Sequence, residues 1–141
     1  MKKTWIDEIK FDANGLVPAI VEDAATHEVL MMAYMNRQAV LKTIKSGTAH
    51  FYSRSRKKMW LKGESSGHIQ RVKKISLDCD GDTVLLSAIQ TGGACHTGYR
   101  SCFFRVLSPG KKWKSRERKL FDPEKVYGKA RLLRPKEKAS Q

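Results

Sequence analysis

The sequence predicts an α+β domain with a mostly antiparallel β-sheet and one main helix, and three observations support this prediction. Apolar runs of strand length recur along the chain, at residues 17–21, 29–35, 49–53 and 83–89. Turn-forming residues separate them, among them an Asp-Gly pair at 80–81. A single stretch, following Asn36, places apolar residues at helical spacing.

The first two runs flank the polar segment 22–27, and we expect them to pair as a hairpin. Asn36 is a favourable N-cap for the helix that follows, and Gly47 is a typical stop signal. We expect the apolar face of this helix to pack in the core, together with the methionines of the second run. These apolar side chains are Val40, Leu41, Ile44, Met31, Met32 and Met35.

The second half of the chain predicts a functional loop and further strands. Residues 54–67 are polar and interrupted by glycines, which favours a loop with a strand on each side. Alternation from 75 to 79 and the apolar run 83–89 predict two strands flanking the Asp-Gly turn. Residues 102–106 resemble another strand, after which Pro109-Gly110 is expected to end the regular part.

The chain has 141 residues and a formal net charge of +14, and its basic residues are unevenly distributed. From Arg105 onward 13 basic and 4 acidic residues give +9, which leaves +5 for the first 104. We therefore expect a domain over residues 1–107 and a basic C-terminal extension over 108–141. Residues 121–123 predict a docking point for the extension, whose end is expected to be disordered.

The sequence predicts a cytoplasmic protein without a membrane anchor. No apolar run approaches the roughly 20 residues that a membrane span needs. The amino terminus becomes acidic at residues 7–8, where a signal peptide would be apolar. In a reducing compartment thiols persist, and three cysteines cannot all pair, so metal ligation is favoured over disulfides.

All three cysteines, Cys79, Cys95 and Cys102, lie between residues 78 and 102. Their spacing matches no paired-knuckle zinc pattern, and three thiolates leave one tetrahedral position on zinc open for water. Zinc lowers the pKa of such a water from about 15.7 to about 7. The alternative is that the cysteines are small buried hydrophobes. His96 is either a fourth ligand or a proton shuttle, and the opposite directions of neighbouring side chains in an extended segment favour the shuttle.

Asp78, Asp80 and Asp82 follow a spacing of two, which would place them on one strand face with Cys79 on the other. Carboxylates gathered in this way repel one another unless a cation lies among them, and hard oxygen ligands suit magnesium or calcium. The twelve-residue EF-hand ligand series is missing. The alternative is a polar hairpin tip in water. A second charged region, residues 54–74, holds eight cations and one Glu and is suited to phosphates of a nucleic acid or of a small substrate.

Five blocks of sequence together resemble the phosphoribosyl-AMP cyclohydrolase family in content, order and spacing. The blocks are 53–56, 60–68, 78–82, 93–98 and 101–103. The resemblance covers roughly residues 15–105, and the helix after Asn36 and residues 121–123 are similar to the free-standing bacterial form. It implies hydrolytic opening of the adenine ring of 1-(5-phosphoribosyl)-AMP, between N1 and C6, in the third step of histidine biosynthesis. The extension is too short to hold the second catalytic domain to which some relatives are fused.

The resemblance also implies an intertwined homodimer whose zinc is completed by cysteines from both chains. Cys79, Cys95 and Cys102 become ligands of one Zn2+ per subunit, and Asp78, Asp80 and Asp82 a Mg2+ site. Zinc-bound hydroxide would attack C6, and His96 would move the proton because its ordinary pKa near 6.5 suits both steps.

The substrate has two phosphate groups, for which the central loop offers contacts. Arg54, Arg56 and Lys62 are candidates for the phosphates. Ser65, Ser66 and Gly67 offer hydroxyl or backbone donors. Trp60 either stacks on a base or packs in the core or a dimer interface, and His50 and His68 belong either to the core or to the site.

Two other readings compete with this one. A basic zinc-binding nucleic-acid module explains the charge and the cysteines but gives no reason for three alternating aspartates, which repel phosphates. A zinc-dependent base deaminase would carry His-x-Glu and Cys-x-x-Cys signatures, which are missing. The sequence therefore predicts a nucleotide substrate, with neither a nucleic acid nor a membrane as partner.

Overall fold

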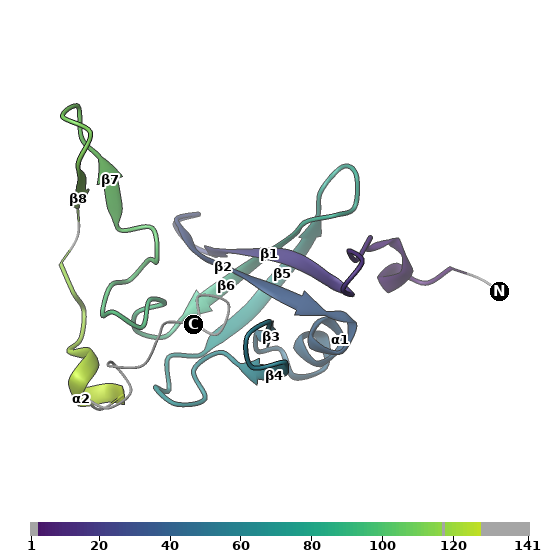
Figure 1. Cartoon of the computed structure of the whole chain (residues 1–141). Helices are drawn as coiled ribbons and strands as arrows, with labels where there is room; N and C mark the ends of the chain where they lie inside the picture. Colours follow the sequence, from purple (N-terminus) through teal and green to yellow (C-terminus); the bar gives the residue numbers. More distant parts are fainter. Residues whose placement is uncertain (1–2, 117, 128–141) are drawn as a thin grey trace.

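The computed structural model describes residues 3–116 and 118–127 and has the predicted α+β composition, mostly strands with one main helix (Figure 1). In chain order the elements are η1 (Trp5–Glu8), β1 (Leu16–Asp23), β2 (Val29–Asn36), α1 (Arg37–Ser46), β3 (His50–Ser53), β4 (Lys58–Leu61), β5 (Gln70–Leu77), β6 (Val84–Gln90), β7 (Arg105–Leu107), β8 (Trp113–Ser115) and α2 (Pro123–Tyr127).

The main sheet has four strands in the order β2-β1-β6-β5. The two outer pairs, β1 with β2 and β5 with β6, are antiparallel hairpins, as the sequence predicts. The central pair is parallel, with a register that runs from Ala19 opposite Val84 to Asp23 opposite Ala88. Parallel pairing needs a long crossover, which α1 and the β3–β4 hairpin provide between the two outer hairpins.

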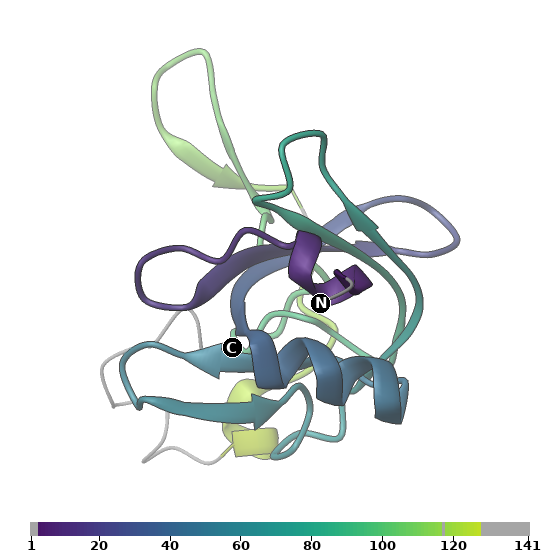
Figure 2. The ribbon, with the colours of Figure 1, turned by 90° about the vertical axis from the view of Figure 1, so that its right-hand side faces the viewer.

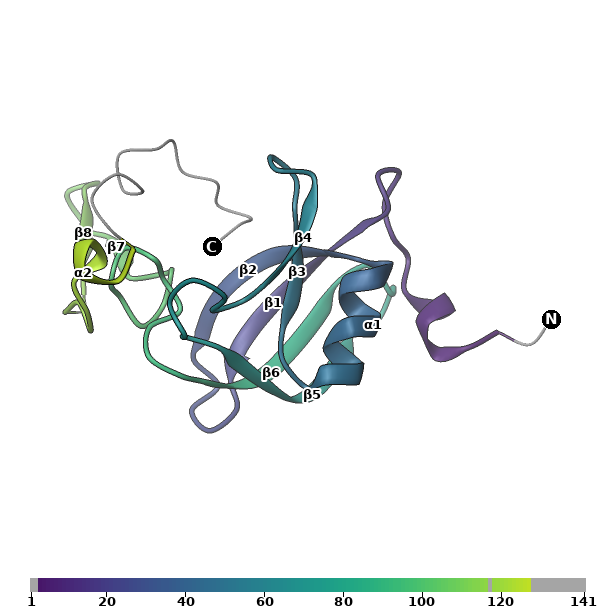
Figure 3. The ribbon, with the colours of Figure 1, turned by 90° about the horizontal axis from the view of Figure 1, so that it is seen from below.

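The core lies between the sheet and a layer formed by α1 and the β3–β4 hairpin, which cover the same face (Figures 1 and 3). Alternate residues of the two central strands are buried, because successive side chains of a strand point to opposite faces. These residues are Val17, Ala19, Val21, Val84, Leu86 and Ala88. From the covering layer, Phe51 and Trp60 pack against each other with ring centroids 5.2 Å apart.

Helix α1 has both predicted ends but buries a different face. The Asn36 side chain accepts a hydrogen bond from the Ala39 N–H (2.8 Å), and Gly47 closes the helix with φ = 77°. The buried residues are Ala39, Val40 and Thr43. The polar side chain of Thr43 can be buried because its hydroxyl donates a hydrogen bond to the Ala39 carbonyl and accepts one from the His50 N–H. Leu41 and Ile44 are therefore 43% and 51% exposed, and Met32 on β2 is 40% exposed, against the expectation that all three are core.

Three further local predictions are corrected. The loop 54–67 contains strand β4, which is too short to show a clear period and buries Trp60. The strand expected at 102–106 begins at Arg105. Beyond Pro109-Gly110 the chain forms β8, which pairs with β7 in a hairpin that projects from the body (Figure 2), and then α2.

The expected docking point at 121–123 is in contact with the body of the domain. The Phe121 ring packs edge-on against His68, with centroids 4.7 Å apart, and Pro123 is buried. The expected disordered end, residues 128–141, lies outside the described residues. Within residues 3–116 and 118–127, no helix combines the length and the apolarity that crossing a membrane requires.

Candidate metal centre

Cys95 and Cys102 lie together in the loop that follows β6. The loop doubles back on itself: the Ala94 N–H donates to the Arg100 carbonyl (2.8 Å) and the Cys95 N–H to the Tyr99 carbonyl (3.1 Å). Cys95 is buried and Cys102 is half-buried, and the two thiols are neighbours that shift each other's pKa. Two soft ligands of a candidate zinc site are thus in place within one chain.

The surroundings of the two thiols favour one thiolate. The hydrogen bond from Cys102 lowers the pKa of Cys95 to about 6, with further help from Thr97, whose hydroxyl lies 2.8 Å from the Cys95 sulfur. The same bond and burial raise the pKa of Cys102. Thr97 was not predicted from the sequence, although its position two residues after a candidate ligand is a signal that a hydroxyl could reach the sulfur.

Lys62 belongs to this centre. Its side chain is 3% exposed, and its ammonium nitrogen donates to the Ala94 carbonyl at 2.6 Å. Burial lowers its pKa to about 8, while the neighbouring Cys102 and Cys95 oppose that shift. The structure therefore places this predicted phosphate contact beside the two thiols.

Of the three histidines that the sequence singles out, His96 lies within this loop, whereas His68 and His50 precede it in the chain. His96 occupies a turn in which the Gly98 N–H donates to the Cys95 carbonyl, so the argument from alternating side chains of an extended segment does not apply to it. His68 is half-buried, and burial lowers its pKa. Gly92 borders the His68 ring so closely that a Cβ there would lie 2.7 Å from its Cδ2. His50 is buried on β3, and its Nδ1 forms a hydrogen bond with the Thr48 carbonyl (2.9 Å).

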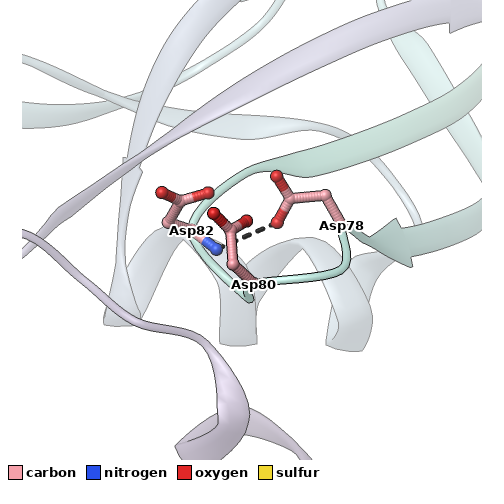
Figure 4. Close-up of side chains that lie close together, drawn as sticks. All are labelled: Asp78, Asp80 and Asp82. Carbon is pink, nitrogen blue, oxygen red and sulfur yellow. Dashed lines mark hydrogen bonds between the residues drawn. The ribbon is translucent and has the colours of Figure 1, made fainter.

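Asp78, Asp80 and Asp82 form a second cluster, in the exposed turn between β5 and β6 (Figure 4). One ligand atom from each lies within 4.8 Å of the others, and the carboxylates extend to the same side of the turn. Asp78 shapes the turn by accepting hydrogen bonds from the N–H groups of Asp82 (3.0 Å) and Thr83 (3.2 Å). Hydrogen bonding and repulsion from Asp80 raise the pKa of Asp82, as expected for crowded carboxylates without a cation.

The turn at 78–83 also corrects the prediction of a strand that separates a thiol face from a carboxylate face. The three aspartates converge because the chain turns at Gly81 (φ = 80°), which needs no strand. Cys79 lies exposed in this turn, before β6, whereas Cys95 and Cys102 follow the other end of β6. At about 3.3 Å per residue, the seven residues of β6 separate them by roughly 20 Å. Among the described residues, the aspartates form the one group of three with metal-ligand spacing.

The predicted substrate contacts occupy the β3–β4 hairpin and the segment after it. Arg54 is exposed and lies over the Tyr34 ring, 4.2 Å from its centroid, and the Arg56 N–H donates to the Ser53 hydroxyl. Trp60 is 4% exposed and packs in the core, one of the alternatives that the sequence left open. Ser65, Ser66 and Gly67 form a turn that leads to His68, in which the Ser66 hydroxyl accepts from the His68 N–H.

Comparison with known proteins decides the family. The family model described as phosphoribosyl-AMP cyclohydrolase matches residues 31–104, more than half of the chain. The chain belongs to the phosphoribosyl-AMP cyclohydrolase family. The match includes both candidate ligand clusters and the loop between the cysteines, and it confirms the resemblance carried by the five sequence blocks.

Relatives named phosphoribosyl-AMP cyclohydrolase extend the match over most of the chain. The protein of Chlorobaculum tepidum is 53% identical over 128 residues, which cover 91% of this chain and 93% of the relative. That of Methanothermobacter thermautotrophicus is 59% identical over 123 residues, covering 84% and 88%, and that of Methanoregula boonei 56% identical over 121 residues, covering 86% and 95%. The chain is thus an enzyme of the phosphoribosyl-AMP cyclohydrolase family.

Proposed function

We propose that this enzyme opens the adenine ring of 1-(5-phosphoribosyl)-AMP by hydrolysis in the third step of histidine biosynthesis. Water adds to C6, the bond between N1 and C6 breaks, and the displaced N1 receives a proton. The observation that carries this proposal is the pair of the buried Cys95 and the half-buried Cys102, with Lys62 beside it, in the loop that also holds His96. This arrangement lies within the region that defines the family.

The chemistry of the thiol pair fits zinc. Cys95 and Cys102 are free thiols in mutual contact, and the buried ammonium of Lys62 offsets the negative charge that their ionisation brings. Zinc prefers thiolate ligands, and Cys79 supplies a third. When bound, zinc supplies the Lewis acidity that makes a water nucleophilic at neutral pH.

We propose a homodimer in which Cys79 of one protomer joins Cys95 and Cys102 of the other. Two observations support this assignment. Cys79 is exposed in its own chain and lies at the other end of β6 from the thiol pair. Leu41, Ile44 and Met32 are exposed apolar side chains of the kind that subunit interfaces cover.

His96 is proposed to move the proton. It directly follows Cys95 in the chain, and an imidazole is the side chain best suited to both accepting and donating a proton near neutral pH. Accepting the proton of the attacking water and returning it to N1 completes the hydrolysis without free acid or base.

The substrate's phosphates are assigned to groups on the β3–β4 hairpin and the following turn. Arg54 and Arg56 provide guanidinium groups, and residues 65–67 provide hydroxyl and backbone donors. We also assign to the nucleotide His68, which follows that turn and borders Gly92 in the loop of residues 91–104, called the thiol loop below. Asp78, Asp80 and Asp82 are proposed to hold magnesium, because their converging oxygens suit a hard cation that relieves their repulsion.

A direct assay tests the function. Phosphoribosyl-AMP is incubated with the purified protein and ring opening is followed by ultraviolet absorbance, before and after a zinc chelator and after zinc is restored. We expect turnover that the chelator abolishes and zinc recovers, and a Cys95→Ser variant that zinc does not recover. Absence of conversion by the zinc-loaded wild type, or conversion that persists in the chelator, contradicts the proposal.

A further inference from the structure

Arg100 ties the thiol loop to the turn between β1 and β2. Its Nη2 forms an ion pair with Asp23, at the end of β1, and its Nε donates to Glu28, just before β2, at 2.9 Å. We call these three side chains the Arg100 clamp. None of these three side chains takes part in the proposed catalysis.

The turn offers the clamp a rigid anchor. The carboxylate of Asp23 is 11% exposed, and its second oxygen accepts hydrogen bonds from the N–H groups of Ala25 (2.8 Å) and Thr26 (3.0 Å). These bonds, together with Arg100, lower the pKa of Asp23, so the carboxylate is ionised at neutral pH. The Ala24 N–H is bonded to the Ala88 carbonyl on β6, so the turn is fixed to the sheet as well.

The clamp acts on the backbone that separates the two thiols. The Arg100 carbonyl accepts the N–H of Ala94, the residue before Cys95. Directly after Arg100, the buried Ser101 hydroxyl donates to the Val29 carbonyl (2.7 Å), and the Cys102 N–H donates to the Leu30 carbonyl (2.7 Å). Arg100 therefore stands where the Cys95 side of the loop is bonded to the Cys102 side, which is itself attached to β2.

We propose that Arg100 is a positioning residue that holds Cys95 and Cys102 at the spacing of two ligands of one metal ion. The inference rests on the proposed function in that it takes the thiol pair to bind zinc. The guanidinium suits this task because its planar fork reaches two carboxylates in fixed directions, whereas the ammonium of lysine has no such fork. Groups that orient metal ligands indirectly typically change metal affinity about 10- to 100-fold when removed.

The test compares Arg100→Lys and Glu28→Gln with Arg37→Gln. The control removes an ion pair of similar length, Arg37 with Asp7 at 3.2 Å, which lies on the surface and away from the thiol loop. Zinc affinity of each purified protein is measured by competition with a chromophoric chelator. Cobalt(II) absorption of the thiolate site is recorded alongside, and the free energy of unfolding of the metal-free protein is measured in urea.

We expect Arg100→Lys to weaken zinc binding about 10- to 100-fold and to change the cobalt spectrum, with Arg37→Gln like the wild type. Glu28→Gln keeps the bond to Asp23 and should show a smaller change in the same direction; it carries the test if Arg100→Lys does not fold. Wild-type zinc affinity and spectrum in these variants, whatever their unfolding free energy, overturn the inference. A Cys95→Ser variant that keeps full zinc affinity would instead overturn the proposed zinc site itself, and this inference with it.

Discussion

The ammonium nitrogen of Lys62 lies 2.6 Å from the carbonyl oxygen of Ala94, the residue directly before Cys95. Burying a cation is costly unless opposite charge compensates it. The Ala94 carbonyl compensates only in part, because burial still lowers the pKa of Lys62 to about 8. In the proposed zinc site, the thiolates of Cys95 and Cys102 would supply further compensation, so the lysine and the metal site would stabilise each other.

Replacing Lys62 with Met should therefore separate metal binding from stability. We expect zinc affinity to fall about 10- to 100-fold, as for other groups next to metal ligands. The metal-free protein should keep or gain stability, because a buried charge is replaced by an apolar chain of similar length. Zinc competition and urea unfolding measure the two effects. Lys58→Met, at an exposed position on the same hairpin, is the control, and equal zinc affinities in the two variants would refute the role of Lys62.

The proposed sharing of zinc between protomers predicts complementation. Cys79→Ser and Cys95→Ser homodimers should each be inactive, because every site lacks one ligand. After the two variants are unfolded together and refolded as a mixture, half of the dimers should be mixed, and one of the two sites in each mixed dimer has all three thiols. We expect about a quarter of wild-type activity, given that such random pairing is complete.

Two controls make the complementation specific. Cys95→Ser mixed with Cys102→Ser should stay inactive, because both lesions fall on the same side of the shared site. Each variant refolded alone should also stay inactive. If Cys79→Ser with Cys95→Ser recovers nothing while refolded wild type is active, the three thiols do not assemble across protomers as proposed.

Local signals predicted the elements that depend on neighbouring residues. The hairpin of β1 and β2 and the ends of α1 at Asn36 and Gly47 follow from turn composition and capping, which act over a few residues. The parallel pairing of β1 with β6 joins strands far apart in the chain, and no local pattern encodes it. The exposed face of α1 was also missed, because spacing identifies an apolar stripe without saying what covers it.

The candidate site was predicted in composition and in part of its geometry. Sequence chemistry identified the thiols and the aspartates, and the structure gathers Cys95 with Cys102 and the three aspartates with one another. The rule that side chains of a strand alternate between two faces placed Cys79 opposite the aspartates. This was wrong because a turn at Gly81 replaces the expected strand. Lys62 was predicted as a phosphate contact, and its burial beside the thiols was not foreseen because composition does not report burial. The Arg100 clamp joins residues more than 70 positions apart and had no sequence signal.

His96→Ala should keep the metal and lose the rate. If His96 transfers the proton, its removal lowers kcat about 10²- to 10⁴-fold, the usual range for a general acid or base. Zinc content, measured on the purified variant, should equal that of the wild type, because Cys79, Cys95 and Cys102 are the proposed ligands. A variant that has lost its zinc would show that His96 is a ligand, and the shuttle assignment would then be wrong.

Asp80→Asn should weaken the response to magnesium without unfolding the protein. Asp80 raises the pKa of Asp82, so its carboxylate is part of a repulsion that the variant relieves in the absence of cation. Thermal unfolding should therefore show a metal-free variant at least as stable as the wild type, with a smaller gain on adding magnesium. The exposed Glu124→Gln is the control for loss of one negative charge. An identical magnesium response in Asp80→Asn and the wild type would reject the assignment.

Gly98 connects the thiol loop to the C-terminal extension, and we expect its replacement by alanine to destabilise the protein. Its φ of 109° lies where side-chain-bearing residues are strained, and a Cβ there would lie 2.6 Å from the Phe121 carbonyl oxygen. Backbone strain of this kind costs on the order of 1–3 kcal/mol. Gly98→Ala should lower the free energy of unfolding in urea by at least this amount.

The added methyl group should displace the backbone at residue 98. Because the Leu120 N–H donates to the Gly98 carbonyl at 2.5 Å, this displacement should extend to residues 120 and 121 and weaken the contact between Phe121 and His68. Hydrogen exchange at residues 118–127 should therefore rise in Gly98→Ala. Gly110→Ala is the matched control, since a Cβ at Gly110 meets its nearest atom at 3.8 Å and φ is not in the left-handed region. Equal unfolding free energies and equal exchange in the two variants would mean that the extension accommodates the added methyl group at no cost. The contact between the extension and the thiol loop would then not contribute to stability.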